Sequence, residues 1–453
     1  MLKLKTVISF TFLLWCIKAL ASFSHGPMLG DLGESNVAIW VRTSLPMAVR
    51  LELQDDLNTI TQIKQLKTTE LKDNTSIFRL QDLEGNTQYH YTVYAGKETL
   101  TGKFKTLDRA KNLEPTRIEF GSCYFQDNLK SEGGNVFKKM YERNPDFVLF
   151  TGDLPYTKKG RLNELRDGHK LFRTNEHFSK LASNVPIYAI YDDHDFGTDN
   201  SDGTFKYKHE ALQAFNEYWP NPPTANGNNL GIYTSFVHKN AEIFLLDTRY
   251  FSQQSSKQPD MLGVEQTSWL CSGLKNSVAD HKIIVSGPSL SSTNADGWSG
   301  QNFSKSKSAL FSCIYENEIS GVFVISGDSH RSEFHKYRLG GWFSGNYLYE
   351  FTSSPLKNDV IESDWPNHSE LIYSYKDEDS QFGELLLSGK SQSAQVDFRI
   401  MSPKVGKIKQ LTLRSDALTI NKDKIHVNYF EIMAIASIIA LIAYLVYRKK
   451  LMQ

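Results

Sequence analysis

The stretch Phe147-Val148-Leu149-Phe150-Thr151-Gly152-Asp153-Leu154-Pro155-Tyr156 decides the fold class, because an apolar, strand-like run passes directly into a polar loop. The same arrangement recurs at three other places, which are Gly121-Ser122-Cys123-Tyr124 after 118–120, Asp192-Asp193-His194-Asp195 after 187–190, and Gly327-Asp328-Ser329-His330 after 322–325. In an open α/β sheet, ligands gather at the carboxyl ends of the strands. A single Asp after a strand is often only a helix cap, but four such clusters together predict a shared metal site.

The rest of the chain divides into an all-β part and an α/β part. Residues 22–108 alternate apolar and polar side chains in short runs, which indicates a small β-sandwich, and 83–93 resemble the pattern of immunoglobulin-like fibronectin type III modules. From 115 to about 415, strand-like runs alternate with helical stretches at 135–143, 164–181, 209–218, 265–274 and 305–316. This alternation predicts an α/β domain of layered sheets with helices outside.

The two ends of the chain look like membrane-targeting segments. Residues 1–21 combine Lys3 and Lys5, a short apolar run after them and a small-residue end, which is typical of a secretory signal peptide. Residues 429–447 are apolar and about long enough to cross a bilayer, and the basic residues of 448–453 would form a short cytoplasmic tail. A cleaved sorting tail is the alternative. We expect a protein that is exported and anchored by this helix, with its bulk periplasmic or extracellular.

Charge and cysteine content limit the partners and the compartment. The chain has 51 Lys and Arg against 51 Asp and Glu, so no net positive field favours nucleic acid. Without the signal peptide three cysteines remain, Cys123, Cys271 and Cys313. In an oxidising compartment an odd number leaves a reactive thiol or a metal-bound thiolate. Cys271 and Cys313 lie in helical-looking segments, and a disulfide between them is one arrangement that the sequence allows if their Cα atoms come close enough.

Asp153 and Tyr156 carry the strongest chemical signal. A carboxylate such as that of Asp153 can bridge two metal ions, and a phenol loses its proton only beside a strong Lewis acid. Together they favour a trivalent ion such as Fe³⁺, and Cys123 adds a thiolate. The alternatives are a turn Asp with a packed Tyr, and a small buried Cys.

The other clusters supply further carboxylates and imidazoles. Three carboxylates around His194 are costly unless a cation neutralises them, and His194 is the candidate general acid because imidazole titrates near neutral pH. Asp328 and His330 form a ligand pair or a polar turn. Arg249 either contacts a substrate phosphate, braces a ligating carboxylate or forms a structural ion pair. The segment 199–202 is a calcium site or a polar turn.

These motifs resemble those of the PhoD-like alkaline phosphatases, a branch of the calcineurin-like metallophosphoesterases. The resemblance runs from 23–26 through the four clusters and Leu246-Asp247-Thr248-Arg249 to Phe382-Gly383. It implies a four-layer αββα sandwich at 115–415, behind the all-β domain, and a mixed Fe³⁺ and Ca²⁺ centre that hydrolyses phosphate mono- and diesters. It also implies ligand roles for the residues quoted above: Fe³⁺ would be held by Cys123, Asp153, Tyr156 and Asp328, and Ca²⁺ by the bridging Asp153, Asp193 and His330.

The chain departs from the broader metallophosphoesterase pattern at three positions. Cys123 replaces an Asp-x-His pair, Asp193 stands where Asn is usual, and Asp328 takes the place of the first His of Gly-His-x-His. These changes favour hard, oxygen-rich coordination over zinc. They leave the division of the ligands between the metals open.

The expected function is metal-dependent hydrolysis of phosphate esters outside the cytoplasm by metal-activated water, with Asp153 and His194 as catalytic residues. The alternative is a non-catalytic, membrane-tethered binding protein that uses the same metal site structurally. A third hypothesis is a metallohydrolase that acts on a sulfate ester or an acyl bond.

Overall fold

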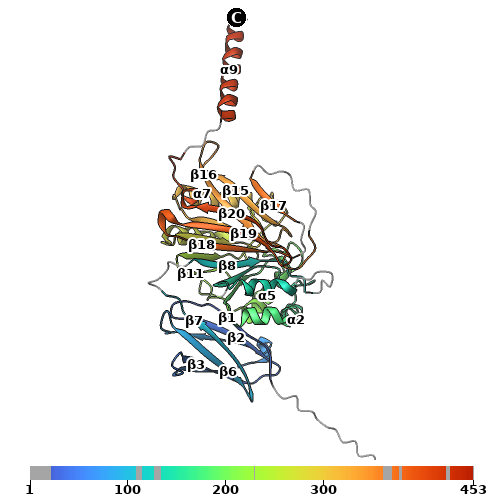
Figure 1. Cartoon of the computed structure of the whole chain (residues 1–453). Coiled ribbons are helices and arrows are strands. Elements are labelled where there is room, and N and C mark those ends of the chain that lie inside the picture. Colours follow the sequence, from blue (N-terminus) through green and yellow to red (C-terminus); the bar gives the residue numbers. More distant parts are fainter. Residues whose placement is uncertain are drawn as a thin grey trace, which may run out of the picture.

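The structure is a computed structural model that describes residues 22–108, 115–126, 134–228, 230–360, 370–376, 380–424 and 429–451. The predicted signal peptide at 1–21 lies outside these residues. Figure 1 shows three parts in a row: an all-β domain, a larger α/β domain and a projecting helix, α9.

The amino-terminal domain is an all-β sandwich, as predicted. One sheet has the order β1-β2-β5 and the other β4-β3-β6-β7. Alternate side chains of these strands, among them Ile39, Leu51 and Phe78, point into a common core. The strands are β1 (Phe23–Gly30), β2 (Val37–Thr43), β3 (Ala48–Asp55), β4 (Ile60–Lys67), β5 (Thr75–Leu80), β6 (Gln88–Ala95) and β7 (Glu98–Lys105), with the short helix η1 (Glu70–Lys72).

Two mixed sheets form the centre of the α/β domain. The first has the order β10-β9-β8-β18-β19-β20 and contains β8 (Thr116–Gly121), β9 (Phe147–Thr151), β10 (Ile187–Ile190), β18 (Phe382–Ser388), β19 (Gln395–Ser402) and β20 (Gly406–Arg414). The second has the order β11-β12-β13-β14-β16-β15-β17 and contains β11 (Thr234–His238), β12 (Ala241–Leu245), β13 (His281–Val285), β14 (Val322–Ser326), β15 (Ser332–Leu339), β16 (Asn346–Thr352) and β17 (Leu371–Tyr375). The rings of Phe351 and Phe398, one from each sheet, stack with their centroids 4.4 Å apart, so the sheets pack face to face.

Helices cover the two outer faces, which completes the predicted four-layer αββα sandwich. Phe137 of α1 packs on Phe150 of β9, and Leu270 of α6 shares a core with Val324 of β14. The expected helix 164–181 is instead two helices, because Asn175 accepts hydrogen bonds from the backbone N–H groups of 177 and 178 and starts a new helix. The helices are α1 (Gly134–Glu142), α2 (Leu162–Arg173), α3 (Glu176–Ala182), α4 (Asp193–Phe196), α5 (Lys208–Tyr218), α6 (Gly263–Asn276), α7 (Ser304–Glu316) and α8 (Ser415–Leu418), with η2 (Ser391–Ser393).

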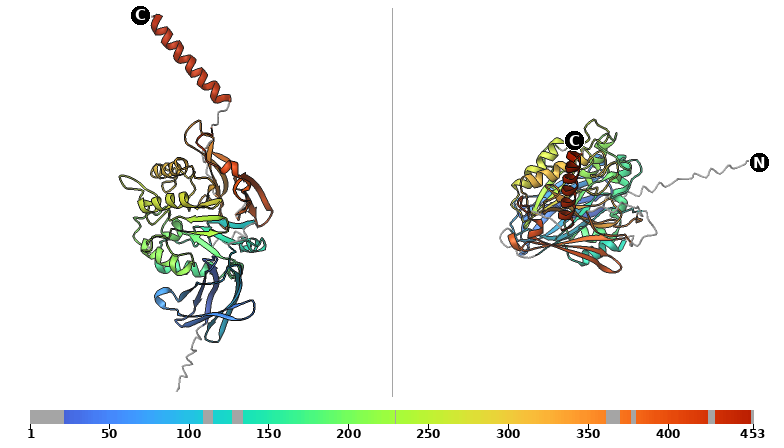
Figure 2. Two further views of the ribbon diagram at one scale, coloured as in Figure 1. Left: turned by 90° about the vertical axis from the view of Figure 1, so that its left-hand side faces the viewer. Right: turned by 90° about the horizontal axis from the view of Figure 1, so that it is seen from above.

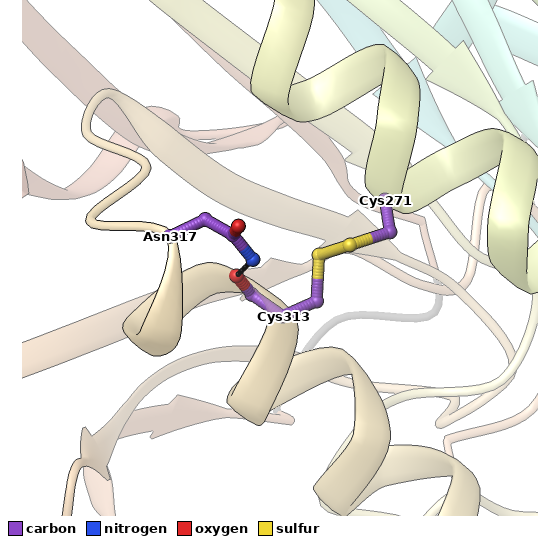
Figure 3. The surroundings of a disulfide bond; sticks show 3 residues. All are labelled: Cys271, Cys313 and Asn317. Carbon is purple, nitrogen blue, oxygen red and sulfur yellow. Dashed lines mark hydrogen bonds between the residues drawn. A yellow bond between two sulfur atoms is a disulfide. The ribbon is translucent and has the colours of Figure 1, made fainter.

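A disulfide joins α6 to α7 on the outer layer of the second sheet. Figure 3 shows Cys271 and Cys313 linked, with their Cα atoms 6.0 Å apart. The pairing that the sequence allowed is therefore present, and among the residues that the structure describes the free cysteine is Cys123, which is buried. Because 42 residues separate the two half-cystines, loop closure in the unfolded chain gives about 4 kcal/mol of stabilisation.

A buried cation fixes the β-sandwich to the α/β domain. The guanidinium of Arg173 lies 5.2 Å from the ring of Trp40, 5.0 Å from that of Tyr218 and 4.5 Å from that of Trp219. Trp40 belongs to β2 and donates its indole N–H to the carbonyl of Glu217, at 2.7 Å. Cation–π contacts in a buried site hold the two domains in one orientation.

The helix α9 (Tyr429–Leu451) covers the predicted membrane anchor at 429–447. Figures 1 and 2 show that it leaves the α/β domain at the end opposite the β-sandwich. Among the residues that the structure describes, no helix combines the length and the apolar character needed to cross a membrane. The side chains of 429–436 lie outside that description.

Candidate metal centre

The four predicted clusters meet at one rim of the sandwich. Three follow β8, β9 and β10, which are adjacent parallel strands of the first sheet, and the fourth follows β14 of the second sheet. A hydrogen bond across the sheets joins them, since the backbone N–H of Asp328 donates to the hydroxyl of Ser122 at 3.1 Å. The sheets thus bring residues separated by about two hundred positions into one site.

The backbone at this rim is held in a conformation that residues with side chains rarely adopt. Cys123, Asp153, Asp328 and His330 have φ angles of 60°, 59°, 65° and 51°. Left-handed residues other than Gly gather at functional sites, where the surrounding structure compensates the strain. Gly152 is required for close approach, because a Cβ there would lie 2.4 Å from the Cβ of Asp192.

One half of the centre surrounds the carboxyl group of Asp153. Its Oδ2 accepts the Tyr156 hydroxyl hydrogen bond at 3.0 Å and lies 3.4 Å from Sγ of Cys123. The same hydroxyl lies 3.0 Å from Nε2 of His330. Nδ1 of His330 lies 2.7 Å from the carbonyl of Asp359, which leaves Nε2 as the ligand atom. A carboxylate, a thiol, a phenol and an imidazole therefore converge on one point.

The other half is made of carboxylates. Ligand atoms of Asp192, Asp193 and Asp328 lie within 4.8 Å of one another, and so do those of Asp153, Asp193 and His194. Asp193 belongs to both groups and joins this half to Asp153. The six predicted metal ligands, Cys123, Asp153, Tyr156, Asp193, Asp328 and His330, are thus all brought together.

Burial makes this concentration of acids unfavourable without a cation. It raises the pKa of Asp153 well above its ordinary range, and the neighbouring Cys123 and Asp193 raise it further. Burial, followed by the charge of Asp296, raises the pKa of Asp328 to about 7. Burial also raises the pKa of Cys123 to about 12. Bound cations would reverse these shifts, so the donor set fits a metal centre.

A sequence model of the PhoD-like phosphatase family matches residues 119–398, which is more than half of the chain. The chain belongs to the PhoD-like phosphatase family. It is therefore a phosphoesterase whose acidic and histidine clusters can bind a metal centre.

Two solved structures share the fold of this PhoD-like phosphatase. The structure of PhoD has a TM-score of 0.73 at 17% identity, with 90% of this chain and 93% of that chain covered. The purple acid phosphatase PPD1 from yellow lupin (Lupinus luteus) seeds has a TM-score of 0.65 at 14% identity, with 89% and 76% covered. No curated protein matches the sequence.

In this PhoD-like phosphatase, His194 lies at the mouth of the centre. Its ring stacks on that of Tyr156 with centroids 4.3 Å apart, and its Nε2 lies 3.8 Å from Oδ1 of the exposed Asp199. Its backbone N–H donates to Asp153 and to Asp193, at 3.2 and 3.0 Å. The backbone of His194 thus orients two ligands while the imidazole stays accessible from solvent.

Arg249 lies beneath the centre and is 1% exposed. It pairs with Asp192 at 2.5 Å and with Asp296 at 2.8 Å, and it donates to the carbonyl of Ser201 at 3.2 Å. These contacts favour the ion pair that braces a carboxylate over a substrate phosphate contact.

The segment 199–202 packs as a polar turn around the ligands. Its Asn200 N–H donates to Asp193 at 2.7 Å, and Asp202 accepts from the backbone of Thr204 and Gln254. These contacts favour the polar turn over a separate calcium site.

Sequence reasoning did not assign three carboxylates that complete the centre. Asp195 accepts the backbone N–H groups of Asp153 and Leu154, and Asp192 has an oxygen, Oδ2, with no hydrogen-bond partner among the described residues. Both belong to the cluster that follows the strand at 187–190, and this position could have marked them as part of the site. Asp296 comes from a loop far along the chain, and no local pattern marked it.

The metal-free protein is expected to become less stable as the pH rises from about 4 to about 7. Burial raises the pKa of Asp328 and of Asp195 to about 7, whereas an unfolded Asp titrates near 3.9. The folded state therefore binds more protons in this window, and its stability falls as they leave.

Melting temperatures of metal-free and metal-loaded protein at pH 5 and pH 8 check this expectation. Metal loading should raise the melting temperature more at pH 8 than at pH 5. Asp328→Asn should make the increase at pH 8 more like the increase at pH 5. An equal gain at both would contradict it.

Proposed function

We propose that this PhoD-like phosphatase hydrolyses phosphate mono- and diesters outside the cytoplasm, with a centre of Fe³⁺ and Ca²⁺. One observation carries the proposal: a thiol, a phenol, an imidazole and several buried carboxyls converge on a single rim. Phenolate and thiolate suit a strongly polarising cation, and the oxygen-rich half suits Ca²⁺.

The ligands divide around Asp153, which lies between the two halves. Cys123 and Tyr156 are assigned to Fe³⁺, and Asp193 to Ca²⁺. Asp328 is close to both sides, because its charge acts on Cys123 while its carboxyl lies beside Asp193. His330 contacts Tyr156, and the carboxyl of Asp328 lies near that of Asp193. These contacts support His330 as a ligand of Fe³⁺ and Asp328 as a ligand of Ca²⁺, which is the reverse of the family-based expectation.

When bound, the cations would supply Lewis acidity for the phosphoryl oxygens and for the attacking water. The protein residues do the rest. Asp153 and Asp193 are held by the backbone of His194, so the ligand geometry is set before substrate arrives. The imidazole of His194, supported by the Tyr156 ring, donates a proton to the oxygen of the leaving alcohol.

Replacing His194 by Ala should separate substrates by their leaving groups. Without the proton donor, an alkyl phosphate should lose about 10²–10⁴-fold in kcat/KM, while p-nitrophenyl phosphate, whose leaving group needs no proton, should lose far less. His90→Ala, at a half-exposed histidine of the β-sandwich, is the matched control. Equal losses on both substrates would reject His194 as the acid.

The reaction itself is tested with purified full-length protein. Phosphate release from mono- and diesters, with and without chelator and with added iron and calcium, should require both metals, and the protein should show a visible phenolate-to-iron absorption band. A panel that includes a sulfate ester and a carboxylic ester separates phosphoester hydrolysis from other hydrolase activities. Turnover that persists after complete metal removal would contradict the proposal.

The location outside the cytoplasm is supported by the sequence of 1–21, by the Cys271–Cys313 disulfide and by the apolar sequence of 429–447. Fractionation of cells that express the full chain, or the chain without 429–453, tests it. Removal of the helix should release the enzyme into the soluble extracytoplasmic fraction, and retention in the cytoplasm would overturn the assignment.

A further inference from the structure

The hairpin between β15 and β16 presents two large aromatic side chains to solvent. Its tip, 340–345, reads Gly-Gly-Trp-Phe-Ser-Gly. Trp342 is 69% exposed and Phe343 is 47% exposed. Of the other Trp residues whose exposure the structure describes, those at 40, 219 and 298 lie in the hydrophobic cores, and the one at 269 is partly buried against a core. Neighbouring exposed aromatics at a loop tip mark a contact surface.

The tip is held rigidly in this exposed position. Arg338 donates to the carbonyl of Trp342, and the N–H of Gly345 donates to the carbonyl of Lys424 at 2.7 Å. Gly340 lies against the ring of Tyr315 on α7, where a Cβ would come within 2.1 Å of ring carbon. These contacts fix the backbone of the tip, from which both aromatic side chains project.

Positive charge lies directly behind the tip. Nζ of Lys336 is 3.7 Å from the ring centroid of Tyr347, and the guanidinium of Arg338 is 5.7 Å from the same centroid. Lys424 completes the group, since its charge and that of Arg338 both act on Lys336. The nearby Lys422 pairs with Glu316 at 3.1 Å, and Asp423 is the exposed acid between the lysines. Four basic side chains thus lie behind the tip, among them Lys424, whose Nζ donates to the backbone carbonyl of Asp416 at 2.9 Å.

The same end of the molecule carries a second exposed apolar surface. Lys424, which the hairpin contacts, comes shortly before α9 in the chain. Within 437–448, where the structure describes the side chains of α9, the larger apolar ones are more than half exposed on all sides of the helix, namely Ile438, Ile439, Leu441, Ile442, Tyr444, Leu445, Val446 and Tyr447. A helical segment that is apolar on all sides is more stable in contact with other apolar groups than with water.

We propose that Trp342 and Phe343 insert into the interface of an anionic lipid bilayer, with Lys336, Arg338 and Lys424 contacting the lipid headgroups. Tryptophan prefers the membrane–water interface, and each basic residue near an anionic surface adds to the attraction. The hairpin would then be a lipid contact in addition to α9, and it would fix which side of the α/β domain faces the bilayer. The inference concerns a surface remote from the metal centre and does not rest on the phosphoesterase reaction.

Fluorescence quenching tests this contact in the full chain. The protein is placed on vesicles of phosphatidylcholine and phosphatidylglycerol that carry shallow brominated lipids. Wild-type emission should be quenched, most of the quenching should be lost in Trp342→Phe, and it should weaken when phosphatidylglycerol is omitted. The difference between the two proteins isolates Trp342 from Trp365, which lies outside the described residues.

A matched control moves the exposed indole to the other end of the molecule. In the Trp342→Phe background, Leu57→Trp restores an indole at an 84% exposed position of the β-sandwich, which should stay unquenched. Equal quenching in wild type and Trp342→Phe would overturn the proposal, as would a dimer in detergent that Trp342→Phe dissociates, because a second copy would then cover the tip. Alkaline extraction of the same vesicles reports on α9 alone, so failure of the anchor is distinguishable from failure of the hairpin.

Discussion

Asp153→Asn is expected to abolish phosphoester hydrolysis and to remove bound metal. The carboxyl of Asp153 is the point that both halves of the centre share, since it contacts Cys123 and Tyr156 and groups with Asp193. Loss of its charge weakens the binding of every cation beside it. The kcat/KM should therefore fall by about 10³-fold or more. Elemental analysis and phosphate release, measured on one preparation, check both effects.

Asp167→Asn on α2 is a suitable control, because that carboxyl is exposed and pairs with Lys170 on the protein surface. A metal content equal to that of the wild type in Asp153→Asn, with activity retained, would remove Asp153 from the centre. Circular dichroism separates loss of metal from loss of fold.

Arg249→Met is expected to cost about 3–5 kcal/mol of unfolding free energy in the metal-free protein, because it leaves two buried carboxylates without a counter-charge. Those carboxylates are Asp192 and Asp296, which the guanidinium contacts at 2.5 and 2.8 Å. The expected loss of stability is large because Arg249, Asp192 and Asp296 are all buried. Urea unfolding of the metal-free variant measures the change.

Arg50→Met is the comparison, since the ion pair of Arg50 with Glu52 lies on the surface of the β-sandwich and should contribute far less. A direct role for Arg249 in substrate binding predicts a different outcome: KM would rise while stability stayed unchanged. That result would support the interpretation, allowed by the sequence, that Arg249 contacts the substrate phosphate.

The metal-binding rim of the αββα sandwich was predictable from the sequence. Its ligands directly follow strands, and each strand is recognisable from a short apolar run alone. Cys123, Asp153, Asp193 and Asp328 each stand within three residues of a strand end, and parallel strands bring such ends to one side. The alternation of strands and helices predicted layered sheets with helices outside, whereas the four-layer αββα arrangement was implied by the resemblance to the family. The two-helix break at Asn175 was missed, because a cap residue inside an apolar period looks like an ordinary helical position.

Other parts of the site were not predictable in this way. The brace formed by Asp296 and Arg249 joins loops that no short-range pattern relates. The proximity of His330 to Tyr156, and of Asp328 to Asp193, depends on left-handed backbone angles that determine where each side chain points. Such angles arise from the packing of two sheets and leave no signature in composition or spacing.

The aromatic enclosure of Arg173 has a practical consequence for preparing the enzyme. One wall of that enclosure, Trp40, comes from the β-sandwich, so a fragment beginning at residue 115 would uncover the guanidinium of Arg173 and the ring of Tyr218, both of which contact Trp40. We therefore expect the α/β part to aggregate when expressed alone. Crystallisation trials and kinetic work should therefore use protein that contains both domains. The β-sandwich should not be treated as a separate domain that moves relative to the metal centre.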